Sequence, residues 1–534
     1  MTLVTGKHFV GGQRSAEGTD SFEASNPATG ETLDGRFLEA ADSEIDRSLA
    51  LADESFAALQ QAPAETIAGL LDKIADGIEA AGDALLARAH AETALPMPRL
   101  TGERARTVGQ TRRFAAIVRE GSWRQARIDR SDPARTPLPK PDVRTMLHAV
   151  GPVVVFGASN FPLAISVAGT DTVSALAARC PVVVKAHPAH PGTCEMLAAV
   201  IDQAVRDAGL PAGVFSLLHG RSHRVGAALV THPKASAVAF TGSLKGGRAL
   251  ADAVAARPQP IPIYAEMGSV NPVFVLPSAL EQRGDAIAEG YLQSVNLGVG
   301  QFCTNPGLLL AAGGPPLDRF LKAAGEKAAA APAATMLHDG IRSAYQEGVA
   351  SIRDTPGVEA VGPARAAAGD ANQAACSLFT APLSLLAEHE SLAAENFGPS
   401  SIVLRCESPD DMLAFAEQME GSLTATIHGT EQDLQDHAPL VRLLERKAGR
   451  LIFNGFPTGI EVCAAMHHGG PYPATTHSGF TSIGNAAIYR FASPVCYQDF
   501  PDSALPAELQ NANPLGLMRL VDGQPSSAPL PSAG

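Results

Sequence analysis

The chain has 534 residues, of which 45% are hydrophobic and 18% charged, and its formal net charge is −14. Single hydrophobic cores stop growing near about 250–300 residues, so this length predicts two or three domains. The apolar fraction excludes a globally disordered chain. The acidic balance and the lack of any Lys/Arg-rich run argue against nucleic acid and anionic membranes as partners.

Helical periodicity dominates the first part of the chain. Residues 63–92 place Ile and Leu three or four positions apart, which predicts an amphipathic helix, and a second helix is predicted at about 100–120. Residues 131–144 contain four prolines. Because proline fixes φ and removes an amide donor, this stretch is predicted to be extended, as a crossover between domains.

From residue 150 onward, short apolar runs alternate with helix-compatible segments. The predicted strands lie within 150–158, 180–186, 213–220, 237–243, 266–277 and 307–313, and the predicted helices at 167–178, 194–208, 222–230 and 278–297. This alternation is typical of parallel α/β sheets and predicts two α/β domains in series. The tail from Gly523 is rich in Pro and Ser and is expected to be disordered.

The cysteines are few and scattered. They are Cys180, Cys194, Cys303, Cys376, Cys406, Cys463 and Cys496. An odd number without a two-residue spacing argues against a disulfide framework or a zinc knuckle and favours a reducing compartment. No signal-peptide-like start and no apolar run of membrane-spanning length occurs, so a cytoplasmic protein without membrane contact is expected.

Four short segments carry residues suited to chemistry. Cys303 lies in an irregular Gly-rich loop, where a thiol can act as a nucleophile or simply fill a buried space. Glu266 can serve as a general base or a solvated charge, and Asn160 can donate to an oxyanion or cap a helix. Gly242 and Ser243 precede a predicted helix whose free amides suit a phosphate, although a tight turn explains them equally well.

The order of these segments is more informative than any one of them. Six motifs follow one another with sensible gaps: Asn160 with Phe-Pro-Leu, Lys185 after a Val run, Phe-Thr-Gly-Ser at 240–243, Glu-x-Gly from Glu266, Gly-Gln-x-Cys at Cys303, and Glu-Asn-Phe-Gly-Pro at 395–399. From about residue 20 to 500, the chain thereby resembles the aldehyde dehydrogenase superfamily.

The resemblance implies an α/β fold with a Rossmann-like cofactor domain, an α/β catalytic domain and a small β oligomerisation arm. The implied segments are 1–132 and 151–265 for the cofactor domain, 266–485 for the catalytic domain, 133–150 and 486–500 for the arm, and 501–534 for a C-terminal extension. Arms of this kind extend a neighbour's sheet in the family, so a homodimer or homotetramer is expected.

The resemblance also implies roles for individual residues. Cys303 would attack an aldehyde to give a thiohemiacetal, Asn160 and the Cys303 amide would hold the oxyanion, and Glu266 would activate the water that hydrolyses the thioester. The implied cofactor contacts are Lys185 at the adenosine ribose, Gly242 and Ser243 at the pyrophosphate, Glu395 and Phe397 at the nicotinamide ribose, and Phe156 through its backbone.

One departure from the family pattern bears on the cofactor. NAD-type members have a Glu three residues after the lysine, where this chain has Pro188. Loss of that charge removes repulsion toward a 2′-phosphate, and Lys185, His187 and Arg221 offer positive partners. NADP is therefore expected, with NAD possible. No metal is expected, because two candidate sets do not have the usual spacing of metal ligands. They are His187, His190 and Cys194, and the adjacent pair His467–His468.

The implied substrate is a small aldehyde. Segments such as 454–476 and 490–501 resemble the subgroup that oxidises 2-oxoglutarate semialdehyde (2,5-dioxovalerate) to 2-oxoglutarate. Arg106 is a candidate for the substrate carboxylate, or else belongs to a solvated helix face. Phe161, Phe302 and Phe456 are expected to wall the tunnel. The alternatives are an NADP-dependent fatty or other aldehyde dehydrogenase, a coenzyme A-acylating enzyme and a non-catalytic ligand-binding protein.

Overall fold

The Val-rich runs of the sequence form the centre of the first sheet in the computed structural model, which describes residues 4–362 and 372–531. The sheet order is β11-β10-β7-β8-β9-β1-β2. Its strands are β7 (Val153–Phe156), β8 (Val182–Lys185), β9 (Phe215–Leu218), β10 (Ala237–Thr241), β11 (Ile263–Glu266), β1 (His8–Val10) and β2 (Gln13–Ser15). Strands β7 to β10 are buried on both faces, which explains why they lack polar alternation.

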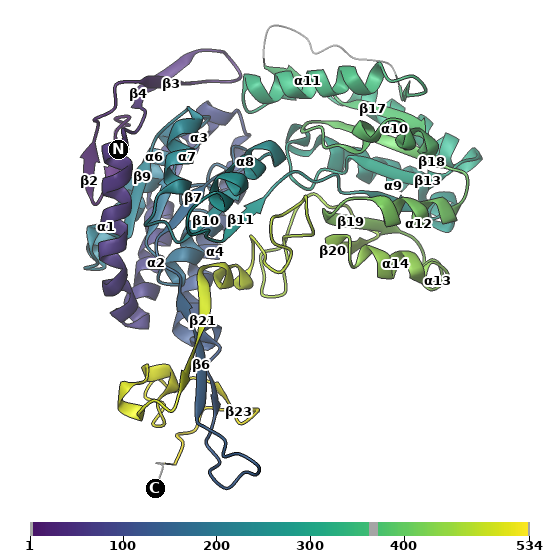
Figure 1. Ribbon diagram of the computed structural model, residues 1–534. Helices are drawn as coiled ribbons and strands as arrows, with labels where there is room; N and C mark the ends of the chain where they lie inside the picture. The colour runs from purple at the N-terminus through teal and green to yellow at the C-terminus, as the bar shows by residue number, and fades with distance from the viewer. Residues whose placement is uncertain (1–3, 363–371, 532–534) are drawn as a thin grey trace.

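Helices cover both faces of this sheet (Figure 1). They are α1 (Asp42–Gln61), α2 (Ala64–Ala80), α3 (Gly82–Thr93), α4 (Met97–Glu120), α5 (Thr170–Ala177), α6 (Pro191–Asp207), α7 (His223–Thr231) and α8 (Leu244–Ala255). The helix predicted at 63–92 is in fact two helices, because Gly82 adopts a φ of 58° and starts a new axis. The second predicted helix is confirmed as α4.

A second sheet forms the other α/β body, with the order β15-β17-β18-β13-β12-β19-β20. Its strands are β12 (Val273–Val275), β13 (Leu308–Ala312), β15 (Glu359–Ala360), β17 (Ser377–Pro382), β18 (Ser400–Cys406), β19 (Ser422–His428) and β20 (Ala448–Phe453). Its helices are α9 (Pro277–Asn296), α10 (Pro315–Ala330), α11 (Asp339–Arg353), α12 (Pro409–Gln418), α13 (Glu431–Asp436) and α14 (Ala438–Leu444). Two small pairs, β3 (Ser21–Ser25) with β4 (Thr32–Leu38) and β14 (Ala334–Thr335) with β16 (Gln373–Ala374), complete the two bodies.

A β arm projects from the first body (Figure 1). Its sheet order is β21-β6-β5-β22-β23, from β5 (Arg127–Asp129), β6 (Val143–Ala149), β21 (Ala492–Gln498), β22 (Arg519–Val521) and β23 (Gln524–Ser526). The arm therefore takes in β5 and the chain beyond residue 500, more than the two segments expected from the sequence. The Pro-rich 131–144 stretch is not an extended crossover between domains: it forms the loop between β5 and β6, with a turn at 133–134, and an antiparallel bridge between Asp132 and Lys140 closes it.

The prediction of disorder from Gly523 is wrong for the described residues. Gly523, with a φ of 80°, turns the chain between β22 and β23. Leu530 then donates its amide to the Asn511 carbonyl and packs on the arm core with Leu509. A Pro/Ser-rich composition predicts disorder only where no partner strand is within reach; here β5 pairs with β22. Residues 532–534 lie outside the described chain.

Candidate active site

Three segments that are distant in sequence bring Cys303, Glu266 and Asn160 between the two bodies. Glu266 is the last residue of β11, and Asn160 follows β7. Cys303 follows a turn at Leu297–Gly300 in which Gly298, Val299 and Gly300 all have positive φ values. The side chain of Asn271 donates to the Cys303 carbonyl at 2.8 Å and fixes this loop.

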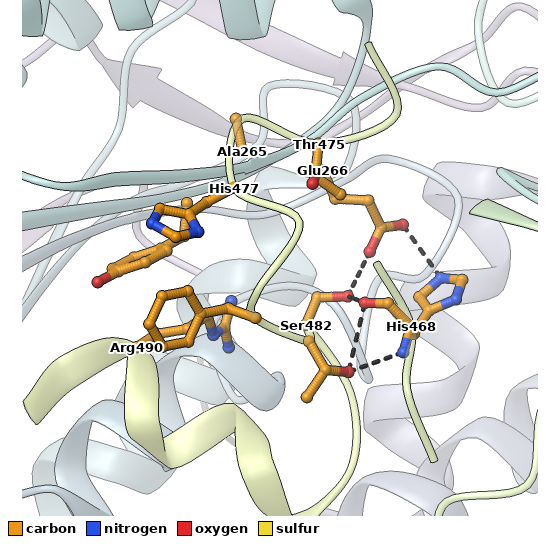
Figure 2. Close-up of a pocket in the computed structure, with 10 residues that line it drawn as sticks. Ala265, Glu266, His468, Thr475, His477, Ser482 and Arg490 are labelled. Atoms are coloured by element: carbon orange, nitrogen blue, oxygen red, sulfur yellow. Dashed lines mark hydrogen bonds and ion pairs between the residues drawn. The ribbon is translucent and has the colours of Figure 1, made fainter. Parts of the chain in front are cut away.

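A histidine joins Cys303 and Glu266. His468 Nε2 lies 3.5 Å from Cys303 Sγ and 3.1 Å from Glu266 Oε1. Ser482 donates its hydroxyl to Glu266 Oε2, and Figure 2 shows Glu266 pointing to both His468 and Ser482. The His468 amide donates to Thr481 Oγ1 at 2.7 Å, so one loop presents both partners of the carboxylate.

The proton affinities within this cluster differ. Burial and the negative charge of Glu266 raise the pKa of the Cys303 thiol well above its ordinary value. Burial alone would also raise the pKa of Glu266, but His468 and hydrogen bonds from Ser482 and Cys303 outweigh it and hold that pKa below its ordinary value. The cluster thus favours a protonated thiol beside an ionised carboxylate.

Asn160 lies beside the nucleophile loop. Its side-chain amide donates to the Gln301 carbonyl at 3.0 Å, and its own carbonyl accepts a 2.6 Å hydrogen bond from Arg99 Nη2. The Gln301 side chain in turn accepts from the Leu337 amide at 3.0 Å, which anchors the loop to the segment that precedes α11. Gln301 is the acceptor of the Asn160 side-chain amide among the described residues, and the amide has a second hydrogen that can donate.

An apolar wall borders the nucleophile. Phe161 and Phe302 meet edge to face at 5.4 Å, and they share a cluster with Ile165, Ile483 and other apolar residues. Phe456, which the sequence analysis places in the same wall, packs instead on the second body. Its ring lies 4.8 Å from that of His428 and 6.4 Å from that of Tyr291.

The structure gathers the expected cofactor residues at the carboxyl ends of the first sheet. Phe156 at the end of β7 is in register with Lys185 and Phe240, and Ser243 caps α8 by accepting from the Gly246 amide. The sheet order reverses between β7 and β10, because β8 and β9 follow on one side and β11 on the other. Ligands of open α/β sheets bind at such a switch point, so these residues fit a dinucleotide.

Two expected cofactor residues, Glu395 and Phe397, line one pocket with Phe302 and Ser269. The Ser269 amide donates to Glu395 Oε1 at 3.3 Å. Desolvation by the surrounding protein raises the pKa of the Glu395 carboxyl to about 7, against the hydrogen bond from Ser269. Its charge acts on Cys303, and its raised pKa makes it easily protonated, in keeping with a hydrogen-bonding role.

The electrostatics around Lys185 modify one expectation. Burial lowers the pKa of Lys185 to about 8, against the opposing influence of Glu39. Burial, His190 and Lys185 hold the pKa of His187 well below its ordinary value, so His187 is a neutral ring rather than a positive partner. Arg221, after β9, is exposed.

The comparisons with known proteins agree with this geometry. Residues 14–472 match the profile described as the aldehyde dehydrogenase family. The chain belongs to the aldehyde dehydrogenase family. It is 51% identical, over 98% of its length and 99% of the relative's, to alpha-ketoglutaric semialdehyde dehydrogenase 2 of Azospirillum brasilense. It is 45% identical, over 98% and 99%, to alpha-ketoglutaric semialdehyde dehydrogenase of Acinetobacter baylyi.

Solved structures show the same fold for this aldehyde dehydrogenase. Lactaldehyde dehydrogenase from Escherichia coli superposes with a TM-score of 0.80 at 19% identity, covering 93% of this chain and 99% of that one. Family membership makes the chain an NAD(P)-dependent oxidoreductase. No helix in the described ranges has the length and apolarity needed to cross a membrane.

Sequence reasoning missed His468 in this dehydrogenase. In the sequence the pair His467–His468 is informative only as a metal pattern. The contact of His468 with Glu266 depends on the chain after it, where Thr475 bridges to Glu266 at the end of β11. Among the described residues, one acidic, Cys and His group is compact enough to hold an ion, namely Glu266, Cys303 and His468, within 4.8 Å. Cys303 and Glu266 are the nucleophile and base that the sequence predicts, and we assign no metal there.

Proposed function

We propose that this aldehyde dehydrogenase oxidises 2-oxoglutarate semialdehyde to 2-oxoglutarate. One observation carries the choice of an anionic substrate. Arg106 on α4 holds Nε and Nη2 buried without a hydrogen-bond partner in the described chain. The Arg106 guanidinium interacts electrostatically with Cys303 and Glu266, and it lies 5.3 Å from the Phe161 ring centre. A buried guanidinium without partners favours a carboxylate ligand.

The surroundings of Arg106 support this assignment. Arg99 stacks on both Phe161 and Phe302 at 4.9 Å, with Nη1 buried and unpartnered in the described chain. Glu103 lies between the two arginines, but Leu163 and Ala164 amides already occupy its Oε1. One carboxylate thus faces two guanidinium groups, so this end of the site, apart from Glu266, keeps a net positive charge.

The residues of the cluster supply the covalent chemistry. Cys303 Sγ bonds to the aldehyde carbon, while the Asn160 side chain and the Cys303 amide donate to the oxygen. Bound NAD(P)⁺ supplies the hydride acceptor. Glu266, held ionised by His468 and Ser482, then takes a proton from the water that hydrolyses the thioester. A hydrolytic base in place favours the acid over a coenzyme A thioester as product.

Lys185, Gly242, Ser243, Phe156, Glu395 and Phe397 would hold the dinucleotide. We propose a preference for NADP, because Pro188 removes a carboxylate and because Lys185 and Arg221 remain cationic partners for a 2′-phosphate. The neutral His187 contributes at most a hydrogen bond. A large excess of kcat/KM with NAD over NADP would overturn this preference.

The two α/β bodies and the arm are assigned separate roles. The body built on the first sheet would bind the cofactor, the body built on the second sheet would be the catalytic domain, and the arm would form the contact between copies. Val495 on the edge strand β21, Phe500 and Leu138 are exposed apolar residues of the arm. Such residues favour a homodimer or homotetramer. Light scattering of the purified chain measures this directly, and a monomer at micromolar concentration would contradict it.

The substrate proposal is tested with paired aldehydes. We compare kcat/KM for 2-oxoglutarate semialdehyde and for pentanal, which has the same chain length without charge, in the wild type and in Arg106→Leu. Loss of a charge-assisted contact worth about 1.5–3 kcal/mol predicts a fall of about 10- to 100-fold for the oxo acid and a much smaller one for pentanal.

The matched control is Arg113→Leu on the exposed face of the same helix, which should change neither substrate. Equal losses with both aldehydes in Arg106→Leu would refute the carboxylate contact. Wild-type rates that are equal for the oxo acid and for a long-chain alkanal would instead favour a fatty aldehyde dehydrogenase.

A further inference from the structure

The thiol of Cys303 needs a proton acceptor that its protein environment must provide. Its Sγ is surrounded by protein and lies next to the ionised Glu266, both of which disfavour the thiolate. Attack on a carbonyl nevertheless requires the thiolate. The proton must therefore leave Sγ as the new bond forms, and the acceptor must lie within contact distance.

Glu266 also contacts the thiol, through a hydrogen bond from Cys303, but it is a weak base toward this thiol. Ser482 occupies its Oε2, and the same contacts that keep it ionised make it a weak base toward a thiol of raised pKa. It is also the group expected to act later on water, a task it can perform only if it is still a carboxylate when the thioester has formed.

His468 meets the geometric requirements. Its Nε2 lies 3.5 Å from Sγ, within hydrogen-bond reach for sulfur, and the residue is only 3% exposed. Its Nδ1 is buried and has no partner in the described chain, so a neutral ring that carries its hydrogen there leaves the Nε2 lone pair toward Sγ. In that state Glu266 keeps its hydrogen bonds from Ser482 and Cys303 but receives none from His468. Glu266 Oε1, 3.1 Å from Nε2, would stabilise the ring once it is protonated.

From this geometry we propose that His468 is a catalytic base that takes the Cys303 proton in the acylation half of the reaction. The proposal rests on the proposed function only for the identity of the aldehyde. The S–H pair becomes the new S–C bond while the proton moves to Nε2. The carbonyl π electrons move to oxygen, held by Asn160. The result is a thiohemiacetal anion beside an imidazolium, which Glu266 Oε1 stabilises.

Other charges that bear on this pair come from several elements. Arg106 of α4 and Arg450 of β20 interact with Cys303, as does Glu395, and His467 lies next to His468 in the chain. Behind Glu266, Arg490 pairs with Asp171 at 2.8 Å. The two arginines stabilise a thiolate and thus assist transfer to His468, while Glu395 opposes it.

The experiment follows alkylation of Cys303 by iodoacetamide in the enzyme without substrate, with the peptide that contains Cys303 quantified by mass spectrometry from about pH 5.5 to pH 9.5. In the wild type, reactivity should rise through the range in which imidazoles titrate. In His468→Gln it should rise only in the alkaline range, with a loss of about 10²-fold at neutral pH. His467→Gln, a half-buried neighbour, is the matched control and should follow the wild type.

A second measurement separates the two half-reactions. In rapid mixing with aldehyde and cofactor, His468→Gln should slow the burst of reduced cofactor and keep its amplitude. An alkylation profile and a burst rate unchanged in a folded His468→Gln would overturn the proposal. If that variant does not fold, the wild-type profile decides, because reactivity that rises only in the alkaline range excludes the base. Alkylation needs no aldehyde, so a wrong substrate assignment leaves this outcome unaffected.

Discussion

At the scale of single residues, the site separates two protonation states within one cluster. The thiol of Cys303 is held protonated by burial, whereas the carboxyl of Glu266 is held ionised by His468 and Ser482. Because the pKa of Glu266 lies below its ordinary value, the base for hydrolysis is present throughout the neutral range. It is lost only on acidification through that lowered pKa.

Glu266→Gln should therefore allow acylation and block hydrolysis. We expect a burst of about one equivalent of reduced cofactor per site, followed by turnover reduced by about 10²- to 10⁴-fold. Rapid-mixing absorbance measures both phases. Adding coenzyme A should not restore turnover, and restoration would indicate an acyltransferase.

Asn160→Ala tests the oxyanion contact. Removing one oxyanion donor costs on the order of 10²–10³ in rate, and we expect that loss in kcat/KM. The alkylation rate of Cys303 serves as the control, because it forms no oxyanion and should stay near the wild-type value. Parallel loss of both would show that Asn160 acts only by holding the Gln301 carbonyl.

At the scale of elements, the nucleophile loop is shaped by a close backbone contact. Gly300 has a φ of 64°, and a Cβ there would lie 2.2 Å from the carbonyl carbon of Gly398. Gly398 belongs to the segment that carries Glu395 and Phe397. Because Gly300 has no side chain, the loop that carries Cys303 can pack directly against the backbone of the segment that lines the cofactor pocket.

Gly300→Ala should lower stability by about 1–3 kcal/mol through strain, and lower the alkylation rate of Cys303 by moving its loop. Gly102→Ala in α4 is the control, since a Cβ there meets no atom within 4 Å. That change should raise stability by about 0.5–1 kcal/mol. Thermal unfolding followed by circular dichroism compares the two, and equal midpoints would argue against the close contact.

At the scale of the whole molecule, the end of the chain completes the arm. Asp522 accepts from the amide and side chain of Arg130, and Arg144 donates to the Leu509 carbonyl at 2.6 Å. Leu509 is fully buried with Ile128 and Met146. The C-terminal segment is therefore a structural part of the arm.

Leu509→Ala should destabilise the arm by about 2–5 kcal/mol, because it leaves a cavity in a small core. Amide hydrogen exchange should accelerate in β5, β6 and β22, while the two α/β bodies keep their protection. Leu515→Ala, at a side chain that is 51% exposed, should change stability by less than about 0.5 kcal/mol. Uniform acceleration across all bodies would mean that the arm does not open separately.

The sequence by itself determined the features that depend on local pattern. Val runs buried on both faces predicted the parallel strands, spacing of Ile and Leu predicted helices, and motif order predicted the family and the positions of Cys303 and Glu266. These predictions hold because each pattern depends only on residues that are close to one another in the sequence.

Only the tertiary structure decided the features that depend on distant contacts. His468 meets Cys303 across 165 positions, and the Asp522–Arg130 contact spans 392. Phe456 and the tail after Gly523 have compositions compatible with several environments, and packing selects one of them. The proton chemistry of the thiol belongs to this second class, because burial and the charges around it come from separate segments of the chain.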